Sequence, residues 1–189
     1  LHITGDIKGL SQGKLYLQKI QDSALVIVDS ILINGDSKFE SHIKLDSPEM
    51  LYLFLDRGET NSIDNSLPFF AEPGNIKIET TLKEFFAAAK ITGSKNHDLW
   101  MKFDSINKRF NEENLVLIEK RLKNEIKPNT TTADSIEQAY QKLLKRKYRF
   151  TAHFAATNGS KEIAPYLALS EIADINTPYL DTIQKSLTP

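Results

Sequence analysis

Hydrophobic residues alternate with polar ones through the first half of the chain and recur every three or four positions through the second half. The first spacing is typical of half-buried β-strands and the second of amphipathic α-helices. Alternation predicts strands over residues 2–10, 14–20, 24–33, 38–45, 50–55, 67–71, 75–80 and 85–92. Seven or eight short strands predict an antiparallel β-sandwich or partly open barrel. An all-α helical region follows, so the predicted fold class is α+β.

Some strand segments carry more specific predictions. Residues 24–33 are apolar on both faces but are interrupted by Asp29 and Ser30, which predicts either a β-bulge or a crossing where one face becomes exposed. The nearly continuous apolar run 50–55 predicts a strand that is covered on both faces. The polar run 56–66 predicts a long exposed loop. Residues 85–92 are predicted as the last strand, although their first half is equally compatible with a helical turn.

The first helical segment carries two similar apolar stripes. Their members are Leu99, Phe103, Ile106 and Phe110, and then Leu115, Ile118, Leu122 and Ile126. They predict either one long helix or two helices that meet near residues 111–114. Pro128 ends this segment, because the residue before a proline is pushed out of helical geometry.

Three further helices follow, each with a predicted N-terminal cap. Thr131 with Asp134 resembles a capping box, Ser160 is predicted to cap the third helix, and Thr177 before a proline the fourth. The predicted buried stripes are Ile136, Tyr140, Leu143, Phe150 and Phe154; Ile163, Tyr166, Leu167 and Leu169; and Leu180, Ile183 and Leu187.

The change of period falls within residues 91–100. Gly93 allows a turn there, and either Ser94 or Asn96 is predicted to cap the first helix. We therefore predict a β-sandwich domain over residues 1–93 and a helical connector domain over residues 94–189. Because no Gly/Ser-rich linker joins them, we expect the two to pack against each other.

Composition excludes several classes of function. Of the 189 residues, 40% are hydrophobic and 26% are charged, as in ordinary globular proteins. The chain has no cysteine, which excludes a structural disulfide, a zinc–thiolate site and a thiol redox centre within these residues. The net charge of −1 gives no long-range attraction to nucleic acid, and no apolar run has the length of a membrane helix. We predict no cofactor, no metal site and no nucleic-acid partner.

The residues that could carry chemistry favour structural interpretations. His2, His42, His97 and His153 are isolated in sequence, and none has the spacing that puts two metal ligands on one helical face. No Gly-x-Ser-x-Gly motif supports a catalytic triad with His153. The acidic pairs Glu112 with Glu113 and Asp56 with Glu59 lie in polar stretches. We therefore predict no catalytic residue and no enzyme activity.

Two other groups of side chains are candidate binding surfaces. The basic cluster Lys142, Lys145, Arg146, Lys147 and Arg149 is predicted to be a solvated helix face, with the stem of Lys147 lying along the apolar stripe. Phe69 with Phe70 and Phe85 with Phe86 each put one ring on either side of a strand. One ring of each pair is then either covered by the helices, which we favour, or free to bind a partner.

Several short motifs of the strand half follow one another in the order of a known domain. They are Ile3-Thr4-Gly5-Asp6-Ile7, Gly13-Lys14-Leu15-Tyr16-Leu17, Val28-Asp29-Ser30, Lys38-Phe39, the run at residues 69–78, and Ile91-Thr92-Gly93-Ser94 with Asn96. The series covers about residues 1–100 and resembles a domain of unknown function at the N-terminus of thioredoxin-like lipoproteins of Bacteroidetes. The helical half is similar, less specifically, to the connector before their thioredoxin-like domain.

The resemblance implies a periplasmic or outer-membrane lipoprotein, anchored through a lipidated cysteine upstream of Leu1. It also implies a thioredoxin-like domain downstream of Pro189, unless this version of the family lacks one. The leading functional hypothesis is a non-catalytic module that positions or recruits a protein partner for thiol–disulfide chemistry. The alternative is a stand-alone envelope lipoprotein that binds a peptide, a glycan or an envelope protein, with the 56–66 loop and the paired phenylalanines as its surface.

Overall fold

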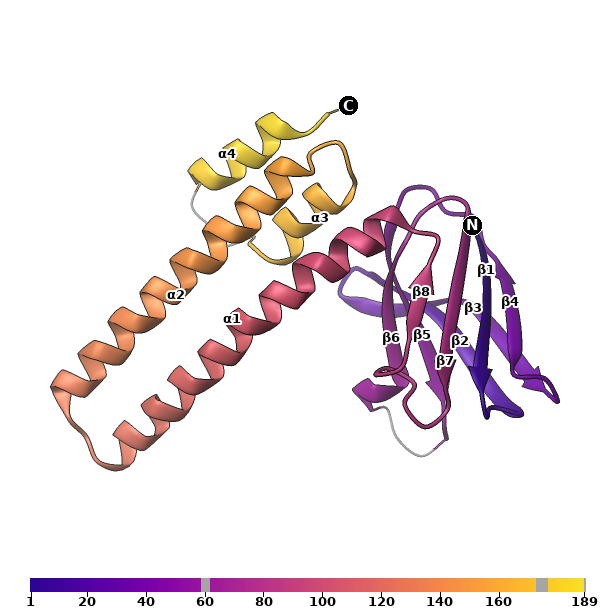
Figure 1. Cartoon of the computed structure of the whole chain (residues 1–189), viewed down its shortest axis with the longest axis horizontal. Helices are drawn as coiled ribbons and strands as arrows, with labels where there is room; N and C mark the ends of the chain where they lie inside the picture. The colour runs from indigo at the N-terminus through magenta and orange to yellow at the C-terminus, as the bar shows by residue number, and fades with distance from the viewer. Residues whose placement is uncertain (59–61, 173–176, 189) are drawn as a thin grey trace. The chain divides into compact units, whose positions relative to one another are not determined.

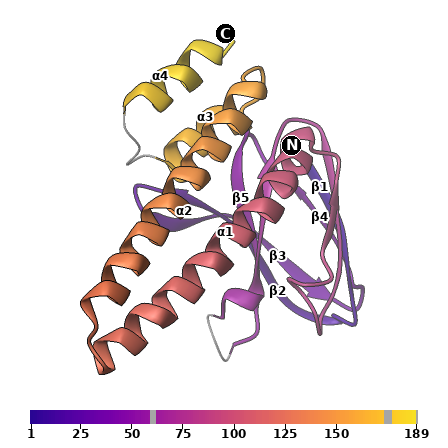
Figure 2. The ribbon, with the colours of Figure 1, turned by 60° about the vertical axis from the view of Figure 1, so that its left-hand side comes forward.

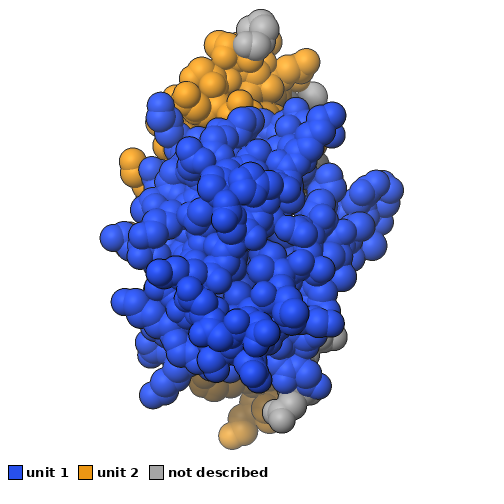
Figure 3. All heavy atoms as spheres, turned by 90° about the vertical axis from the view of Figure 1, so that its right-hand side faces the viewer, with its two compact units in different colours: residues 1–98 blue, residues 99–189 orange. Residues whose placement is uncertain are grey.

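The computed structural model describes residues 1–58, 62–172 and 177–188. The chain divides into two compact units, Leu1–Asp98 and Leu99–Pro189 (Figure 3). The first unit contains the strands and the second contains most of the helical residues.

The described residues of the first unit form two four-stranded sheets (Figure 1). One sheet has the order β4-β1-β7-β8 and the other the order β3-β2-β5-β6. The strands are β1 (His2–Lys8), β2 (Gln12–Gln21), β3 (Ala24–Asn34), β4 (Lys38–His42), β5 (Glu49–Asp56), β6 (Ser66–Ala71), β7 (Asn75–Thr81) and β8 (Lys90–Thr92). The predicted sandwich or partly open barrel of seven or eight strands, followed by helices, is confirmed. One ladder, β1 with β7, runs parallel rather than antiparallel.

A single hydrophobic core lies between the two sheets. Alternate residues of each strand contribute to it, such as Ile3 and Ile7 from β1 and Leu51, Leu53 and Leu55 from β5. Tyr52 and Phe54, on the other face of β5, are only half-buried. Met50 on this second face is buried, as is its cross-strand partner Phe70. The prediction that both faces of this strand are covered is therefore confirmed at Met50 and met only in part at Tyr52 and Phe54.

The segment before β8 is a turn rather than a strand. Thr81 Oγ1 accepts a hydrogen bond from the backbone N–H of Glu84 at 3.1 Å, and the N–H of Ala88 donates to the carbonyl of Glu84 at 2.8 Å. These bonds close a helical turn, so the alternative interpretation of residues 85–89 is right and the strand shrinks to Lys90–Thr92.

The polar run 56–66 is not exposed throughout. It ends in a 3₁₀ turn, Ile63–Asn65, in which Asn65 is buried. Residues 59–61 of this run lie outside the described residues. The prediction of an exposed loop is therefore wrong at its C-terminal end.

The junction between the strands and the first helix is fully capped. Ser94 Oγ accepts a hydrogen bond from the N–H of His97 at 2.9 Å, which confirms Ser94, rather than Asn96, as the cap. The Glu72 carboxylate accepts further bonds from the N–H groups of Lys95 at 2.9 Å and Asn96 at 3.1 Å. Gly93 has a φ of +100°, and a Cβ there would overlap the carbonyl oxygen of Asn75.

Within the described residues, four helices follow in the order α1 (Lys95–Ile126), α2 (Thr130–Thr157), α3 (Ile163–Ser170) and α4 (Thr177–Ser186). The first is one continuous helix, and both views show α1 and α2 side by side and antiparallel (Figures 1 and 2). The short helices α3 and α4 contact α2. Among the described residues, no helix combines the length and the apolar character that crossing a bilayer requires.

Part of the predicted helical core is exposed. Phe103 and Phe110 are buried on α1, but Ile106 is exposed, as is the whole second stripe of Leu115, Ile118, Leu122 and Ile126. Leu169 on α3 is exposed as well. The second stripe lies near the α1–α2 connection. Among the described elements, α3 and α4 instead pack on the other end of α2, around Ala152, Ala155 and Ala164. Two helices alone leave much of each apolar stripe in water.

Two predicted caps are wrong. Asn129 caps α2, since its Oδ1 accepts from the N–H of Thr132 at 2.9 Å, and Thr131 lies inside the helix. The helix α3 begins after Glu162, which makes no side-chain cap, rather than at Ser160. The side chain of Thr177, the predicted cap of α4, lies outside the described part of the chain.

Candidate functional site

Strands β2 and β3 extend beyond their sheet as a two-stranded hairpin (Figure 2). β5 pairs with β2 only over residues 14–19, so the hairpin tip, residues 20–25, has no third strand. Asp22 and Ser23 turn the tip with positive φ values of 49° and 69°. We call residues 18–28 the β2–β3 arm.

The β2–β3 arm exposes large apolar side chains on both faces. They are Ile20, Leu25, Val26, Ile27 and Val28. Transfer of such side chains out of water is favourable by roughly 1.5–3 kcal/mol each when burial is complete. An exposed cluster of this kind is characteristic of a surface that is covered by a partner.

The outer edge of the arm is also unpaired. β3 is the edge strand of its sheet, and its residues 24–28 contain neither charge nor proline. Natural edge strands usually carry such residues to prevent pairing with other chains. A bulge separates the arm from the sandwich, because the register shifts between Leu17↔Asp29 and Gln18↔Ile27 and leaves Val28 without a partner on β2. The bulge predicted at Asp29 and Ser30 is thus confirmed next to Asp29.

The side chain of Asp29 marks where the arm begins. It accepts a hydrogen bond from the hydroxyl of Ser41 on β4 and so ties β3 to the opposite sheet. Among the described side chains on the tip side of this bond, Lys19 of β2 pairs through its Nζ with Glu49 Oε1 on β5 at 3.4 Å, and no side chain of residues 24–28 is tied to another strand. The arm is therefore free to pair with an added strand along its outer edge.

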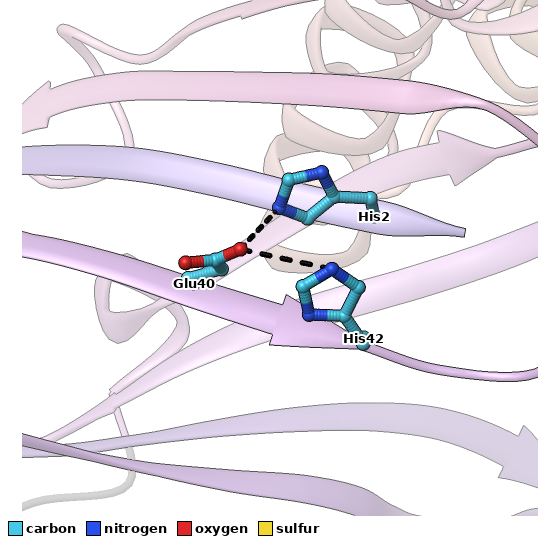
Figure 4. Close-up of side chains that lie close together, drawn as sticks. All are labelled: His2, Glu40 and His42. Carbon is cyan, nitrogen blue, oxygen red and sulfur yellow. Dashed lines mark hydrogen bonds and ion pairs between the residues drawn. The ribbon is translucent and has the colours of Figure 1, made fainter.

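A second candidate site lies on the outer face of the other sheet (Figure 4). His2 on β1 lies directly opposite His42 on β4, and Glu40 lies two residues before His42, so all three side chains share one face. Glu40 Oε1 is 2.7 Å from His2 Nε2 and 3.6 Å from His42 Nε2. Among the described residues, this is the one group of three or more His, Asp and Glu side chains whose ligand atoms all lie within 4.8 Å of one another.

The two imidazole rings of this cluster are stacked. Their centroids are 4.1 Å apart and their planes differ by 11°. A third strand contributes Asn75, whose Oδ1 is 3.2 Å from His2 Nδ1. Two imidazoles and a carboxylate can hold a proton between them or bind a transition-metal ion.

The other two histidines do not join the cluster. His97 is buried, and its Nδ1 accepts a hydrogen bond from the N–H of Phe70 at 3.3 Å. Burial lowers the pKa of His97, which Asp98 partly offsets. His153 is exposed on α2.

The predicted charged candidates are surface side chains. Glu113 Oε2 lies 2.9 Å from Arg146 Nη1 in a surface ion pair, and Glu112 is exposed. Glu59 lies outside the described residues. The side chain of Lys147 is only partly exposed, as expected if its stem lies along the apolar stripe. Its Nζ is 3.4 Å from Glu171 Oε2. The remaining basic side chains, Lys142, Lys145 and Arg149, are exposed, which is the predicted solvated face.

The paired phenylalanines differ from each other. Phe69 lies in the sandwich core, and Phe70 is buried although it points to the opposite face. Phe85 is buried in the core, whereas Phe86 is 43% exposed. Of these four rings, Phe86 alone is available to a partner.

Local sequence patterns did not reveal either site. The histidines of the cluster are 40 positions apart, and only the register of β1 with β4 brings them together. The arm could have been noticed, because residues 24–28 are apolar on both faces and a half-buried strand needs only one apolar face. The sequence pattern predicts only that one face becomes exposed at Asp29 and Ser30, whereas residues 25–28 are exposed on both faces.

Comparison with known proteins identifies the strand half. A family model described as a domain of unknown function, DUF4369, matches residues 1–100, which is more than half of the 189-residue chain. The predicted likeness to a domain of unknown function is thereby confirmed. No curated protein matches the chain.

Proposed function

The chain belongs to the DUF4369 family of domains of unknown function, and from this premise we propose that it is a non-catalytic recruitment module. It serves an exported, lipid-anchored envelope protein and positions a thioredoxin-like partner for thiol–disulfide chemistry. Because the chain contains no cysteine, the reacting thiols belong to the partner.

The exposed apolar β2–β3 arm is the observation that carries the proposal. The uncharged stretch 24–28 of this edge strand, with exposed Leu25 and Ile27, offers both unpaired backbone groups and apolar side chains to an extended segment. β-strand addition uses these two features, since main-chain hydrogen bonds provide affinity and alternate side chains provide specificity. The proposed occupant is an extended apolar edge segment of the thioredoxin-like domain.

The resemblance to the N-terminal domain of thioredoxin-like lipoproteins supports this choice of partner. A module that is carried on the same polypeptide as its partner needs only modest affinity, because the linker keeps the partner at a high effective concentration. A small two-stranded arm suits a contact of that strength.

The gene provides the first test. We expect a lipoprotein signal upstream of Leu1 and a thioredoxin-like domain downstream of Pro189. If the gene has neither, the link to thiol–disulfide chemistry is lost.

Binding provides the second test. Isothermal titration of the chain with that thioredoxin-like domain is expected to show saturable binding, which Ile27→Lys weakens by about tenfold or more, equivalent to about 1.4 kcal/mol. Leu122→Lys on α1 is the matched control, because Leu122 is 54% exposed and Ile27 is 53% exposed. Loss of binding with Leu122→Lys but not with Ile27→Lys would move the docking surface away from the arm.

One observation favours the alternative of a stand-alone binding lipoprotein. Phe86 is exposed on the turn before β8 and can stack on a ligand. In that case the titration with the thioredoxin-like domain shows no saturable binding, and binding of a peptide, glycan or envelope protein is weakened by Phe86→Ala and not by Ile27→Lys.

A further inference from the structure

We propose that His2, Glu40 and His42 form a binding site for an exchangeable divalent transition-metal ion, represented by Zn²⁺. Two imidazole nitrogens and one carboxylate oxygen are ligands that Zn²⁺ commonly takes in proteins, with water in the remaining position. The three side chains come from paired strands of one sheet, so a rigid backbone holds them close. This site is separate from the β2–β3 arm and does not depend on recruitment by it.

The distances in the cluster are close to those that an ion requires. Tetrahedral coordination with bonds of roughly 2.0–2.1 Å puts neighbouring ligand atoms about 3.3 Å apart. His42 Nε2 is 3.6 Å from Glu40 Oε1 and already meets this spacing. His2 Nε2 is 2.7 Å from the same oxygen, so the ion replaces the proton of that hydrogen bond and the two atoms separate by about 0.6 Å.

The side chains are free to make this adjustment. The side chain of His42 is 67% exposed and that of Glu40 is 60% exposed. Rotation about the side-chain bonds of His42 and Glu40 turns His42 Nε2 and the Glu40 carboxylate toward the point that His2 Nε2 faces, and the strands need not move.

Asn75 orients one of the ligands. Its Oδ1 lies 3.2 Å from His2 Nδ1 and accepts the Nδ1 proton, which leaves Nε2 to face Glu40 and the ion. Metal-binding histidines usually have such an acceptor on the second nitrogen, because it fixes the tautomer and the ring orientation. The contact follows from the register, in which Asn75 on β7 lies directly opposite His2.

The carboxylate of Glu40 is not neutralised by a basic side chain. Within the described part of the chain, its ion pairs are with His2 and His42 and not with lysine or arginine. The neighbouring Lys77 on β7 pairs with Glu79 at 2.8 Å instead. The negative charge of Glu40 is therefore available to a cation.

Titration of the whole, tag-free chain with ZnCl₂ by isothermal calorimetry tests the proposal. This protein carries no affinity tag but has two extra residues before Leu1. The α-amino group then lies away from His2 and cannot act as a ligand. We expect one Zn²⁺ per chain and X-ray absorption with two imidazoles in the first shell. His42→Ala and Glu40→Gln should each weaken binding by at least about tenfold, and Asn75→Ala by up to about tenfold.

His153→Ala is the matched control, because His153 is also an exposed histidine but lies on α2. It should leave affinity and stoichiometry unchanged. Circular dichroism of each variant establishes that it is folded before titration. The proposal is overturned by a chain that shows no saturable Zn²⁺ binding, or by folded His42→Ala and Glu40→Gln variants that bind as tightly as the parent.

Discussion

Glu72 and Asn96, which are 24 positions apart, share two hydrogen bonds at the start of the long helix α1. Glu72 Oε2 accepts from the backbone N–H of Asn96 at 3.1 Å and from its side-chain amide at 2.7 Å. The other carboxylate oxygen accepts from the N–H of Lys95. A negative charge at a helix N-terminus satisfies free N–H groups and interacts favourably with the helix dipole. The β6–β7 turn thereby holds the first turn of the helix.

Glu72→Gln should lower the free energy of unfolding at pH 7 by about 1 kcal/mol, because the charge at the helix start is lost. Burial alone raises the pKa of Glu72, but hydrogen bonds from Lys95, Asn96 and Ser94 outweigh it and hold the pKa below its ordinary value. The contribution is therefore complete above the unfolded-state pKa and is lost as the pH falls through the lower folded-state pKa.

Urea denaturation of the parent and Glu72→Gln at pH 7 and at pH 3 measures this effect. The difference between the two proteins should shrink at the lower pH. Glu84→Gln is the control, since Glu84 is an exposed carboxylate of the same unit. A difference that stays constant with pH would exclude the charge as its cause.

His97 should make stability depend on pH in a separate, higher range. Burial lowers the pKa of His97, and its neutral Nδ1 accepts the Phe70 N–H. Because the folded-state pKa is depressed, this contribution is complete above the ordinary histidine pKa of 6.5 and is lost as the pH falls through the folded-state value. The urea midpoint should fall between pH 7.5 and pH 5, and less steeply in His97→Asn, whose amide oxygen can still accept. Equal slopes for His97→Asn and the exposed-residue control His153→Asn would contradict this.

Gly93→Ala should be more destabilising than Gly35→Ala. Both glycines have positive φ, +100° and +92°, so each substitution carries a backbone cost of about 1–2 kcal/mol. A Cβ at Gly93 also overlaps the carbonyl of Asn75, whereas one at Gly35 meets no atom within 4 Å. We expect a further loss of about 1–3 kcal/mol at Gly93. Similar denaturation midpoints for the two variants would show that the close approach to Asn75 is relaxed easily.

Interactions between residues near in sequence could be predicted, and those that depend on distant pairing could not. Ser94 caps its own helix three residues on, so the pattern reveals it, whereas Glu72 caps the same helix from 23 positions away. Alternation placed the strands, but the contact of His2 with His42 needs the register of two strands. Likewise, the spacing of Leu115 and Leu122 predicts a helix but not whether they are buried. Their burial depends on how many other helices pack against that face.

Truncation of Phe85 should lower the stability strongly, whereas truncation of the adjacent Phe86 should hardly change it. Phe85 is buried in the sandwich core, so Phe85→Ala should cost about 3–5 kcal/mol. Phe86 is exposed, so Phe86→Ala should change stability by no more than about 0.5 kcal/mol. Thermal or urea unfolding of the two variants measures the contrast. A large loss for Phe86→Ala would mean that its ring is covered in solution.

Thr151→Val should stabilise the helical unit. Thr151 is fully buried on α2, and its hydroxyl has no hydrogen-bond partner among the described residues. Valine keeps the branched shape and removes a buried polar group whose desolvation is uncompensated, so we expect a gain of about 1 kcal/mol. Thr157→Val is the matched control near the end of the same helix, because the Thr157 hydroxyl is exposed and donates to the carbonyl of His153 at 2.9 Å. It should give no gain. Urea unfolding followed by circular dichroism at 222 nm compares the two, and a loss of stability in Thr151→Val would show that a bound water satisfies this hydroxyl.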